Sequence, residues 1–265
     1  MDAVALLRLQ VEWGADEALG DVPWDRLSPA HPSLAQPRPL DGAPPRAALA
    51  ATPRAVPAAA APAEAQRLAD AAATLDALRA AMEGFAGCAL RLTASNLVFG
   101  DGAAEAGVAL VGEAPDAESD RSGRAFAGPG GRMLDAMLGS IGLGRRDVRL
   151  LTMTPWRPPG GRAPSESEVA ACLPFVQRHI ALLRPRALVL MGNAACKWVG
   201  GVEGGARRAR GRWHAVRVPG LDGTAPALVL PPPEQVMTQA AAREAAWREL
   251  LRLRRTLDGA EPDPR

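Results

Sequence analysis

Beyond residue 65, short apolar runs alternate with longer stretches in which apolar residues recur at helical spacing. The apolar runs predict strands at 97–99, 108–111, 148–153, 187–191, 215–218 and 227–230. The amphipathic stretches predict helices at about 65–85, 131–141, 165–183, 193–199 and 238–253. Ser165 and Glu168 form a capping box for the helix at 165–183. Uniformly apolar strands separated by helices indicate an α/β fold with three layers, α/β/α, around a central, mostly parallel sheet.

The N-terminal part of the chain has a different pattern. Residues 2–13 are amphipathic, and we expect residues 1–27 to form an N-terminal helical segment. Alanine and proline dominate residues 28–66, and such a stretch buries too little apolar surface to offset its ordering entropy. We therefore predict a linker at 28–66, a folded domain at 67–256 and a flexible tail at 257–265.

Composition narrows the class of protein. A chain of 265 residues that is 48% hydrophobic can bury one sizeable core. The formal net charge of +2 indicates no strong overall field for a nucleic-acid partner. Three cysteines form no disulfide framework, and neither a signal peptide nor a membrane-spanning segment is recognisable, so we expect a monomer in the cytoplasm.

The loops that follow the strands hold the candidate chemistry. In a parallel sheet, ligands bind beyond the carboxyl ends of the strands, which places 112–120, 154–162 and 192–195 at one rim. In the first loop, ALVGEAPDAESD (109–120), an apolar strand gives way to four carboxylates. Carboxylates at such a rim can orient a water molecule or stabilise a cation. Alternatively, they cap the following helix or hydrate the rim.

Residues 112–138 resemble the first motif of the family 4 uracil-DNA glycosylases. The positions in register are Gly112, Glu113, Ala114, Pro115, Asp120, Gly123, Phe126, Gly128, Leu134 and Asp135. Later blocks of the family resemble the segments 156–185, 188–201, 210–213 and 245–251. The resemblance covers about 67–256 and implies the fold of the uracil-DNA glycosylase superfamily. It also implies hydrolysis of the N-glycosidic bond of uracil or another deaminated base in DNA, as in base excision repair.

The resemblance assigns a role to each matching position. Glu113 and Asp120 are the candidate catalytic carboxylates, which would stabilise a cationic sugar or orient water. The candidate base-binding residues are Gly112, Ala114, Pro115, Asp116, Phe126 and Thr152, with Phe126 offering a face to a base that has left the stack. Arg157, Arg162 and Arg212 are the candidate DNA-binding residues. Taken alone, Phe126 would fit a core and the arginines a hydrated surface, and His179 is interpreted as structural.

The chain departs from the family at the cysteines. Members of the family carry four cysteines around a 4Fe–4S cluster. Cys88 and Cys172 occupy two of the ligand positions, whereas Phe85 and Trp156 stand at the other two. We therefore predict that the cluster is absent, that no cofactor or metal is bound, and that Cys88 and Cys172 are remnants of the cluster site.

The chain also departs from the family around the base. Pro231 stands in place of a histidine, Thr152 in place of an asparagine and Asp116 in place of a glycine. Losing a group that stabilises a developing anion typically costs on the order of 10²–10³ in rate. We therefore expect weak or altered activity on uracil. The alternative is a catalytically silent protein that binds DNA, or that docks to a repair or replication protein through residues 1–27.

Overall fold

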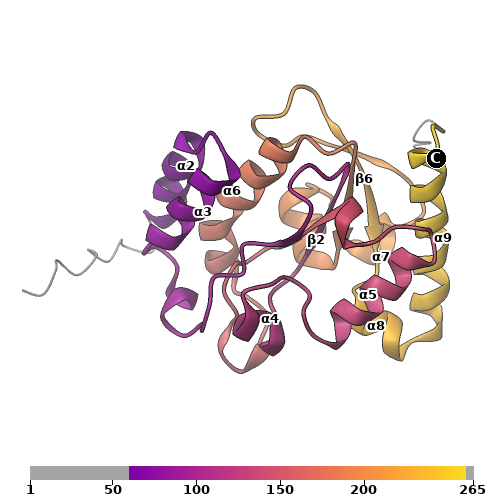
Figure 1. Cartoon of the computed structure of the whole chain (residues 1–265), viewed down its shortest axis with the longest axis horizontal. Helices are drawn as coiled ribbons and strands as arrows, with labels where there is room; N and C mark the ends of the chain where they lie inside the picture. Colours follow the sequence, from indigo (N-terminus) through magenta and orange to yellow (C-terminus); the bar gives the residue numbers. More distant parts are fainter. Residues whose placement is uncertain (1–59, 261–265) are drawn as a thin grey trace, which may run out of the picture. The chain divides into compact units, whose positions relative to one another are not determined.

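The computed structural model describes residues 60–260, so the predicted helical segment at 1–27 and most of the predicted linker lie outside the described residues. A six-stranded sheet with the order β1-β3-β2-β4-β6-β5 forms the centre of this part (Figure 1). The strands are β1 Asp101–Gly102, β2 Val108–Gly112, β3 Val148–Thr152, β4 Ala187–Met191, β5 His214–Val216 and β6 Ala225–Leu230. The helices are α2 Ala61–Ala71, α3 Leu75–Gly84, α4 Ala117–Ser122, α5 Pro129–Gly139, α6 Glu166–Leu183, α7 Ala206–Ala209, α8 Pro233–Thr238 and α9 Ala240–Leu257.

The four inner strands are parallel, and only the edge strands β1 and β5 are antiparallel to their neighbours. Gly112 at the end of β2 pairs with Thr152 at the end of β3, and Met191 at the end of β4 pairs with Leu230 at the end of β6. The carboxyl ends of all four inner strands therefore meet at one edge of the sheet, as the sequence predicts.

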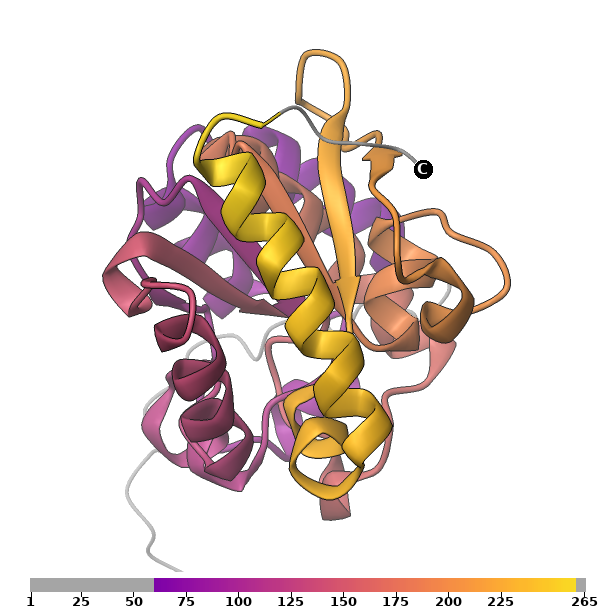
Figure 2. The same ribbon diagram turned by 90° about the vertical axis from the view of Figure 1, so that its right-hand side faces the viewer.

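Helices cover both faces of the sheet. Alternate residues of β2, such as Val108 and Leu110, face a core built with α5, α8 and α9, and α9 lies across this face in Figure 2. The intervening residues, such as Ala109 and Val111, face a second core built with α6, α7 and the π-helix η4 (Ala195–Val199). Burial on both faces explains why the strands are uniformly apolar. The prediction of a three-layer α/β/α fold is confirmed.

The region before the sheet differs from the prediction in two ways. Helix α2 begins at Ala61, inside the predicted linker, because Ala61, Ala65 and Ala69 form a buried stripe that packs near α6. The predicted single helix at 65–85 is two helices, because Thr74 is extended and caps α3 by accepting a hydrogen bond from Ala77 N at 3.1 Å.

The predicted strand at 97–99 is also wrong. Val98 and Phe99 are buried as expected, but the segment is irregular, and Val98 N donates to the carbonyl of Pro155 at 2.8 Å. The edge strand is the short β1 instead. By contrast, the capping box of Ser165 and Glu168 is present at the start of α6. No helix within residues 60–260 has both the length and the apolar character needed to cross a membrane.

His179 is buried on α6 among aromatic and cationic groups. Its Nε2 accepts a hydrogen bond from Arg149 Nε at 3.2 Å, and its ring lies 4.5 Å from that of Phe99. The Arg79 guanidinium lies over the Phe99 ring, 4.7 Å from its centroid. Burial lowers the pKa of His179 to about 3, and the charges of Arg149 and Arg79 act in the same direction. The imidazole therefore stays neutral near pH 7.

The low pKa of His179 predicts loss of stability in acid. Between the unfolded pKa of about 6.5 and the folded pKa, only the unfolded chain binds this proton, so the free energy of unfolding falls by about 1.4 kcal/mol per pH unit as the pH is lowered. His179→Gln keeps an acceptor for Arg149 and should remove this part of the slope. Urea unfolding of both proteins between pH 7 and pH 5 measures the difference, and parallel slopes would contradict the prediction.

Candidate active site

The loops after β2, β3, β4 and β6 enclose a cleft of about 460 Å³ at the carboxyl edge of the sheet, which we call the first cleft. Eight of the eleven predicted catalytic, base-binding and DNA-binding residues line it: Gly112, Glu113, Ala114, Pro115, Asp116, Phe126, Arg157 and Arg162. The remaining wall comes from 158–164, Met191 and the segment 232–235. Segments that are far apart in sequence therefore meet where the strand pattern predicts.

Glu113 follows β2 directly, and its side chain is exposed. Its Oε1 accepts hydrogen bonds from Asn193 N at 3.1 Å and from Ala194 N at 3.4 Å. A Cβ atom at Gly192, whose φ is +94°, would lie 2.5 Å from Oε1, so a side chain there would displace the carboxylate. The free N–H groups at the start of a helical segment attract a carboxylate, and these two hydrogen bonds fix the Glu113 side chain beside the cleft.

Asp116 caps helix α4. Its Oδ1 accepts a hydrogen bond from Ser119 N at 2.7 Å, and its Oδ2 lies where a Cβ atom at Gly128 would be, 2.0 Å away. The carboxylate therefore lines the cleft with one oxygen bound to the helix N-terminus. Asp116 places a negative charge where the family has a glycine, and the N-terminus of α4 partly compensates this charge.

Phe126 has a left-handed backbone with φ of +54°, which costs about 1–2 kcal/mol for a residue other than glycine. Its ring lies against the backbone of Gly112, where a Cβ atom would be 2.4 Å from Cζ. Its carbonyl oxygen lies so close to α5 that a Cβ atom at Gly131 would be 1.7 Å away. Glycine at 112 and 131 thus allows the ring to form one wall of the first cleft.

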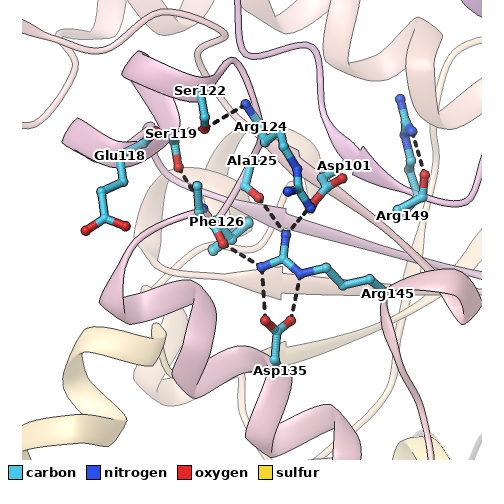
Figure 3. A network of polar contacts seen from close by, with 12 residues as sticks. Asp101, Glu118, Ser119, Ser122, Arg124, Ala125, Phe126, Asp135, Arg145 and Arg149 are labelled. Atoms are coloured by element: carbon cyan, nitrogen blue, oxygen red, sulfur yellow. Dashed lines mark hydrogen bonds and ion pairs between the residues drawn. The ribbon is translucent and has the colours of Figure 1, made fainter.

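Arg145 holds this strained loop in place. Its guanidinium donates to the carboxylates of Asp101 and Asp135 and to the carbonyl oxygens of Ala125 and Phe126, as Figure 3 shows. The contacts to Phe126 O and to Asp135 measure 2.5 Å and 2.8 Å. Burial raises the pKa of Asp101, but hydrogen bonds from Arg124 and Arg145 outweigh it and bring the pKa below its ordinary value. The same pairing raises the pKa of Arg145, so Arg145 and Asp101 face each other as an ion pair.

The two predicted arginines of the 157–162 loop differ in their partners. The Arg162 guanidinium donates to both carboxylate oxygens of Glu168, at 2.8 Å and 2.6 Å. This pairing is the main cause that lowers the pKa of Glu168 to about 2. Arg157 is half-buried, and its Nε has no hydrogen-bond partner within residues 60–260. Arg157 therefore lines the cleft without an ion-pair partner in the described part of the chain, whereas Arg162 is paired with Glu168.

Three predicted site residues do not line the cleft. Asp120 is buried in α4, and its Oδ1 accepts a hydrogen bond from Ser95 N at 2.9 Å, which ties the segment before the sheet to α4. Thr152 is buried, and its hydroxyl donates to the carbonyl of Thr154 at 2.8 Å. Arg212 is exposed and does not line the first cleft. The polar side-chain atoms of Asp120 and Thr152, which the sequence analysis assigned to a ligand, therefore bond to backbone groups of the protein instead.

The segment after β6 brings in residues that the sequence analysis missed. Pro231 is buried, while Glu234 and Gln235 of α8 line the first cleft. The Glu234 carboxylate lies at the start of α5, where a Cβ atom at Gly130 would be 2.1 Å from Oε1. Gln235 is exposed and also lines a larger cleft of about 650 Å³, which we call the second cleft. Neither residue belongs to a motif, so only the fold identifies them.

The sulfur atoms of Cys88 and Cys172 lie 3.8 Å apart in a buried cluster with Phe85 and Trp156. The Cys172 thiol donates to Cys88, which raises the pKa of Cys172 and lowers that of Cys88. No group of three or more histidine, cysteine or carboxylate side chains within residues 60–260 could hold a metal ion.

Several curated proteins named type-4 uracil-DNA glycosylase are similar to this chain. The protein from Pyrobaculum aerophilum is 39% identical over 110 residues, which is 42% of this chain and 56% of the relative. The protein from Archaeoglobus fulgidus is 38% identical over 112 residues, 42% of this chain and 56% of the relative. The protein from Thermotoga maritima is 36% identical over 108 residues, 41% of this chain and 56% of the relative. The chain thus matches about half the length of these relatives.

These relatives correct the prediction that no cofactor is bound. Type 4 is the family that carries a 4Fe–4S cluster, so the comparisons point to a cluster and the prediction of its absence is wrong. A cluster of this kind is held by four cysteine thiolates. Cys88 and Cys172 fit two of these positions, and Phe85 and Trp156 supply no sulfur, so these four positions do not provide a complete ligand set.

The family itself is identified by a longer match. Residues 99–251 match the family model described as the uracil DNA glycosylase superfamily. This range contains β1 to β6, both clefts and Arg145, and it is more than half of the 265-residue chain. The chain belongs to the uracil-DNA glycosylase superfamily.

Proposed function

We propose that this protein hydrolyses the N-glycosidic bond of uracil or another deaminated base in DNA. The observation that carries the proposal is the convergence of Glu113, Phe126 and Arg157 in one cleft at the carboxyl edge of the sheet. The three side chains supply a charge for the sugar, a face for the base and a guanidinium for a phosphate. Membership of the superfamily and similarity to proteins named type-4 uracil-DNA glycosylase support the same reaction.

The base enters the first cleft after it leaves the DNA stack. A volume of about 460 Å³ lies within the range of small-molecule pockets. The Phe126 ring gives the base a stacking surface, and the backbone of 112–115 gives it polar groups. Arg145 acts as a positioning residue, because it fixes the carbonyl of Phe126 without lining the cleft.

The glycosidic bond breaks with its electron pair moving to the base, and water supplies the hydroxyl group that the sugar gains and the proton that the released base takes up. The sugar becomes cationic in this step, and the Glu113 carboxylate stabilises it. The departing base becomes anionic, and the donors that face it include main-chain N–H groups and the Gln235 amide. Pro231 can neither donate a hydrogen bond nor titrate, which supports weak or altered activity.

A glycosylase assay tests this function. Oligonucleotides that carry uracil, hypoxanthine or xanthine are incubated with the full chain, and alkali reveals abasic sites. We expect release of at least one deaminated base. Release of none, together with DNA binding that depends on Arg157, would instead support a catalytically silent DNA-binding protein, the reading that Pro231 favours.

Arg157 should contribute more to DNA affinity than Arg162. A charged hydrogen bond is worth about 1.5–3 kcal/mol, so Arg157→Ala should weaken binding of a single-stranded oligonucleotide about tenfold or more. Arg162→Ala is the matched control, because Glu168 already occupies its guanidinium. Fluorescence anisotropy over a salt series measures both effects. Equal losses in the two variants would contradict the distinction.

A further inference from the structure

The second cleft adjoins the first and has the opposite charge balance. Three arginines, Arg207, Arg210 and Arg248, line it together with a single carboxylate, that of Glu113. Three alanines of α9, at 241, 242 and 245, form part of its wall, so small side chains leave the space between the arginines open. The first cleft instead has three carboxylates, Glu113, Asp116 and Glu234, and two arginines.

The guanidinium groups of the second cleft lack protein partners. Within residues 60–260, neither Arg207 nor Arg210 has a carboxylate within 4.0 Å, and Arg248 has only an exposed contact of 3.7 Å with Glu244. Arg210 is half-buried, and its Nε is buried without a hydrogen-bond acceptor in the described residues. Burial lowers the pKa of Arg210, which means that its charge is incompletely stabilised by the protein. A bound anion in the cleft would supply the missing negative charge.

The segment that carries Arg207 and Arg210 is fixed at both ends. Asn193 Oδ1 accepts a hydrogen bond from Ala206 N at 2.9 Å. Glu249 Oε1 accepts one from Gly211 N at 2.8 Å, and Glu249 also pairs with Arg252. The segment is therefore anchored to the loop after β4 and to α9 before any ligand binds, which lowers the ordering cost of binding.

Glu113, Pro232 and Gln235 line both clefts, so the two clefts are direct neighbours. A chain molecule with one unit in the first cleft can place its neighbouring unit in the second. Arginine binds phosphate through two parallel hydrogen bonds, and contacts of this kind position nucleic acids without reading their sequence. A nucleic acid strand carries such a phosphate between each nucleotide and the next.

We infer that the second cleft is a phosphate subsite, in which Arg207, Arg210 and Arg248 hold the backbone of the nucleic acid strand next to the nucleotide in the first cleft. This inference rests on the proposed function, because the strand reaches the second cleft from the first. Of these arginines, Arg207 lies outside the segments that resemble the family, whereas Arg210 and Arg248 fall within 210–213 and 245–251, where the sequence analysis gives neither a role.

The test measures binding and base release separately. Arg207→Gln, Arg210→Gln and the double variant are compared with Arg217→Gln, which makes the same change of charge at an exposed arginine outside both clefts. Binding of a single-stranded, uracil-free oligonucleotide to the full chain is followed by anisotropy over a salt series. Each lost phosphate contact should lower the slope of log K against log salt by about 0.7. Urea unfolding checks that each variant is folded, and Arg210→Lys should restore part of the affinity.

The inference is upheld if the double variant loses affinity about tenfold or more and its salt slope falls by about 1.4, while Arg217→Gln changes the affinity by less than about twofold and leaves the slope unchanged. Equal losses in Arg217→Gln would overturn it in favour of diffuse electrostatics. Inorganic phosphate as a competitor separates the sources of the anion: phosphate binding that requires Arg210, with oligonucleotide binding that does not, would make the cleft a small-anion site. If the wild type releases a base and the double variant binds DNA as tightly as the wild type, the subsite alone is refuted. If DNA binding depends on Arg210 but the wild type releases no base, the proposed function alone is refuted.

Discussion

Replacing Glu113 with glutamine should reduce the release of a deaminated base by on the order of 10²-fold or more, with almost no change in DNA affinity. The carboxylate would interact with a positive charge that exists on the sugar only in the transition state. Glutamine has nearly the same size, and its oxygen can still accept the N–H groups of Asn193 and Ala194, so the site should keep its shape.

Single-turnover release and anisotropy measure the two quantities. Glu118→Gln is a matched control, because Glu118 lies five residues further along the chain in α4, pairs with Arg132 at 3.5 Å and does not line the first cleft. Release should be unchanged in this control. Equal release by the wild type and Glu113→Gln would remove the carboxylate from the mechanism, and a parallel loss of affinity would assign it to binding.

Replacing Arg145 with leucine should lower the free energy of unfolding by about 2–4 kcal/mol, because the change leaves partly buried carboxylates and carbonyl groups without their donor. Phe126 would also lose the contact that holds its left-handed backbone, so its ring should leave the cleft wall. Base release should therefore fall more than DNA affinity does.

Urea unfolding at pH 7 and single-turnover release test this effect. Arg146→Leu is the matched control, since Arg146 is 93% exposed and makes only a 3.9 Å contact with Asp147. Arg145→Lys should recover part of the stability, because it restores one charge without the planar fork of donors. A change in unfolding free energy below about 0.5 kcal/mol in Arg145→Leu, the range of an ordinary surface substitution, would contradict the assigned role.

The sequence by itself determined the sheet and much of the first cleft. Strands β2, β3 and β4 are apolar on both faces because helices bury both faces, so the runs at 108–111, 148–153 and 187–191 identified them. Parallel strands bring their carboxyl ends together, and this rule alone placed Glu113 beside Arg157. Apolar runs of this kind are local in sequence, and they reflect burial because apolar side chains are the ones that folding removes from water.

Only the tertiary structure decided which polar groups are free to bind a ligand. Asp120 and Arg162 are charged residues in the predicted loops, yet Ser95 N and Glu168 occupy their polar atoms. The arginines of the second cleft are 41 residues apart at the extremes, 207 and 248, and they meet because α9 packs beside the end of β6. Hydrogen-bond partners depend on contacts between distant segments, and such contacts leave no periodic pattern in the sequence.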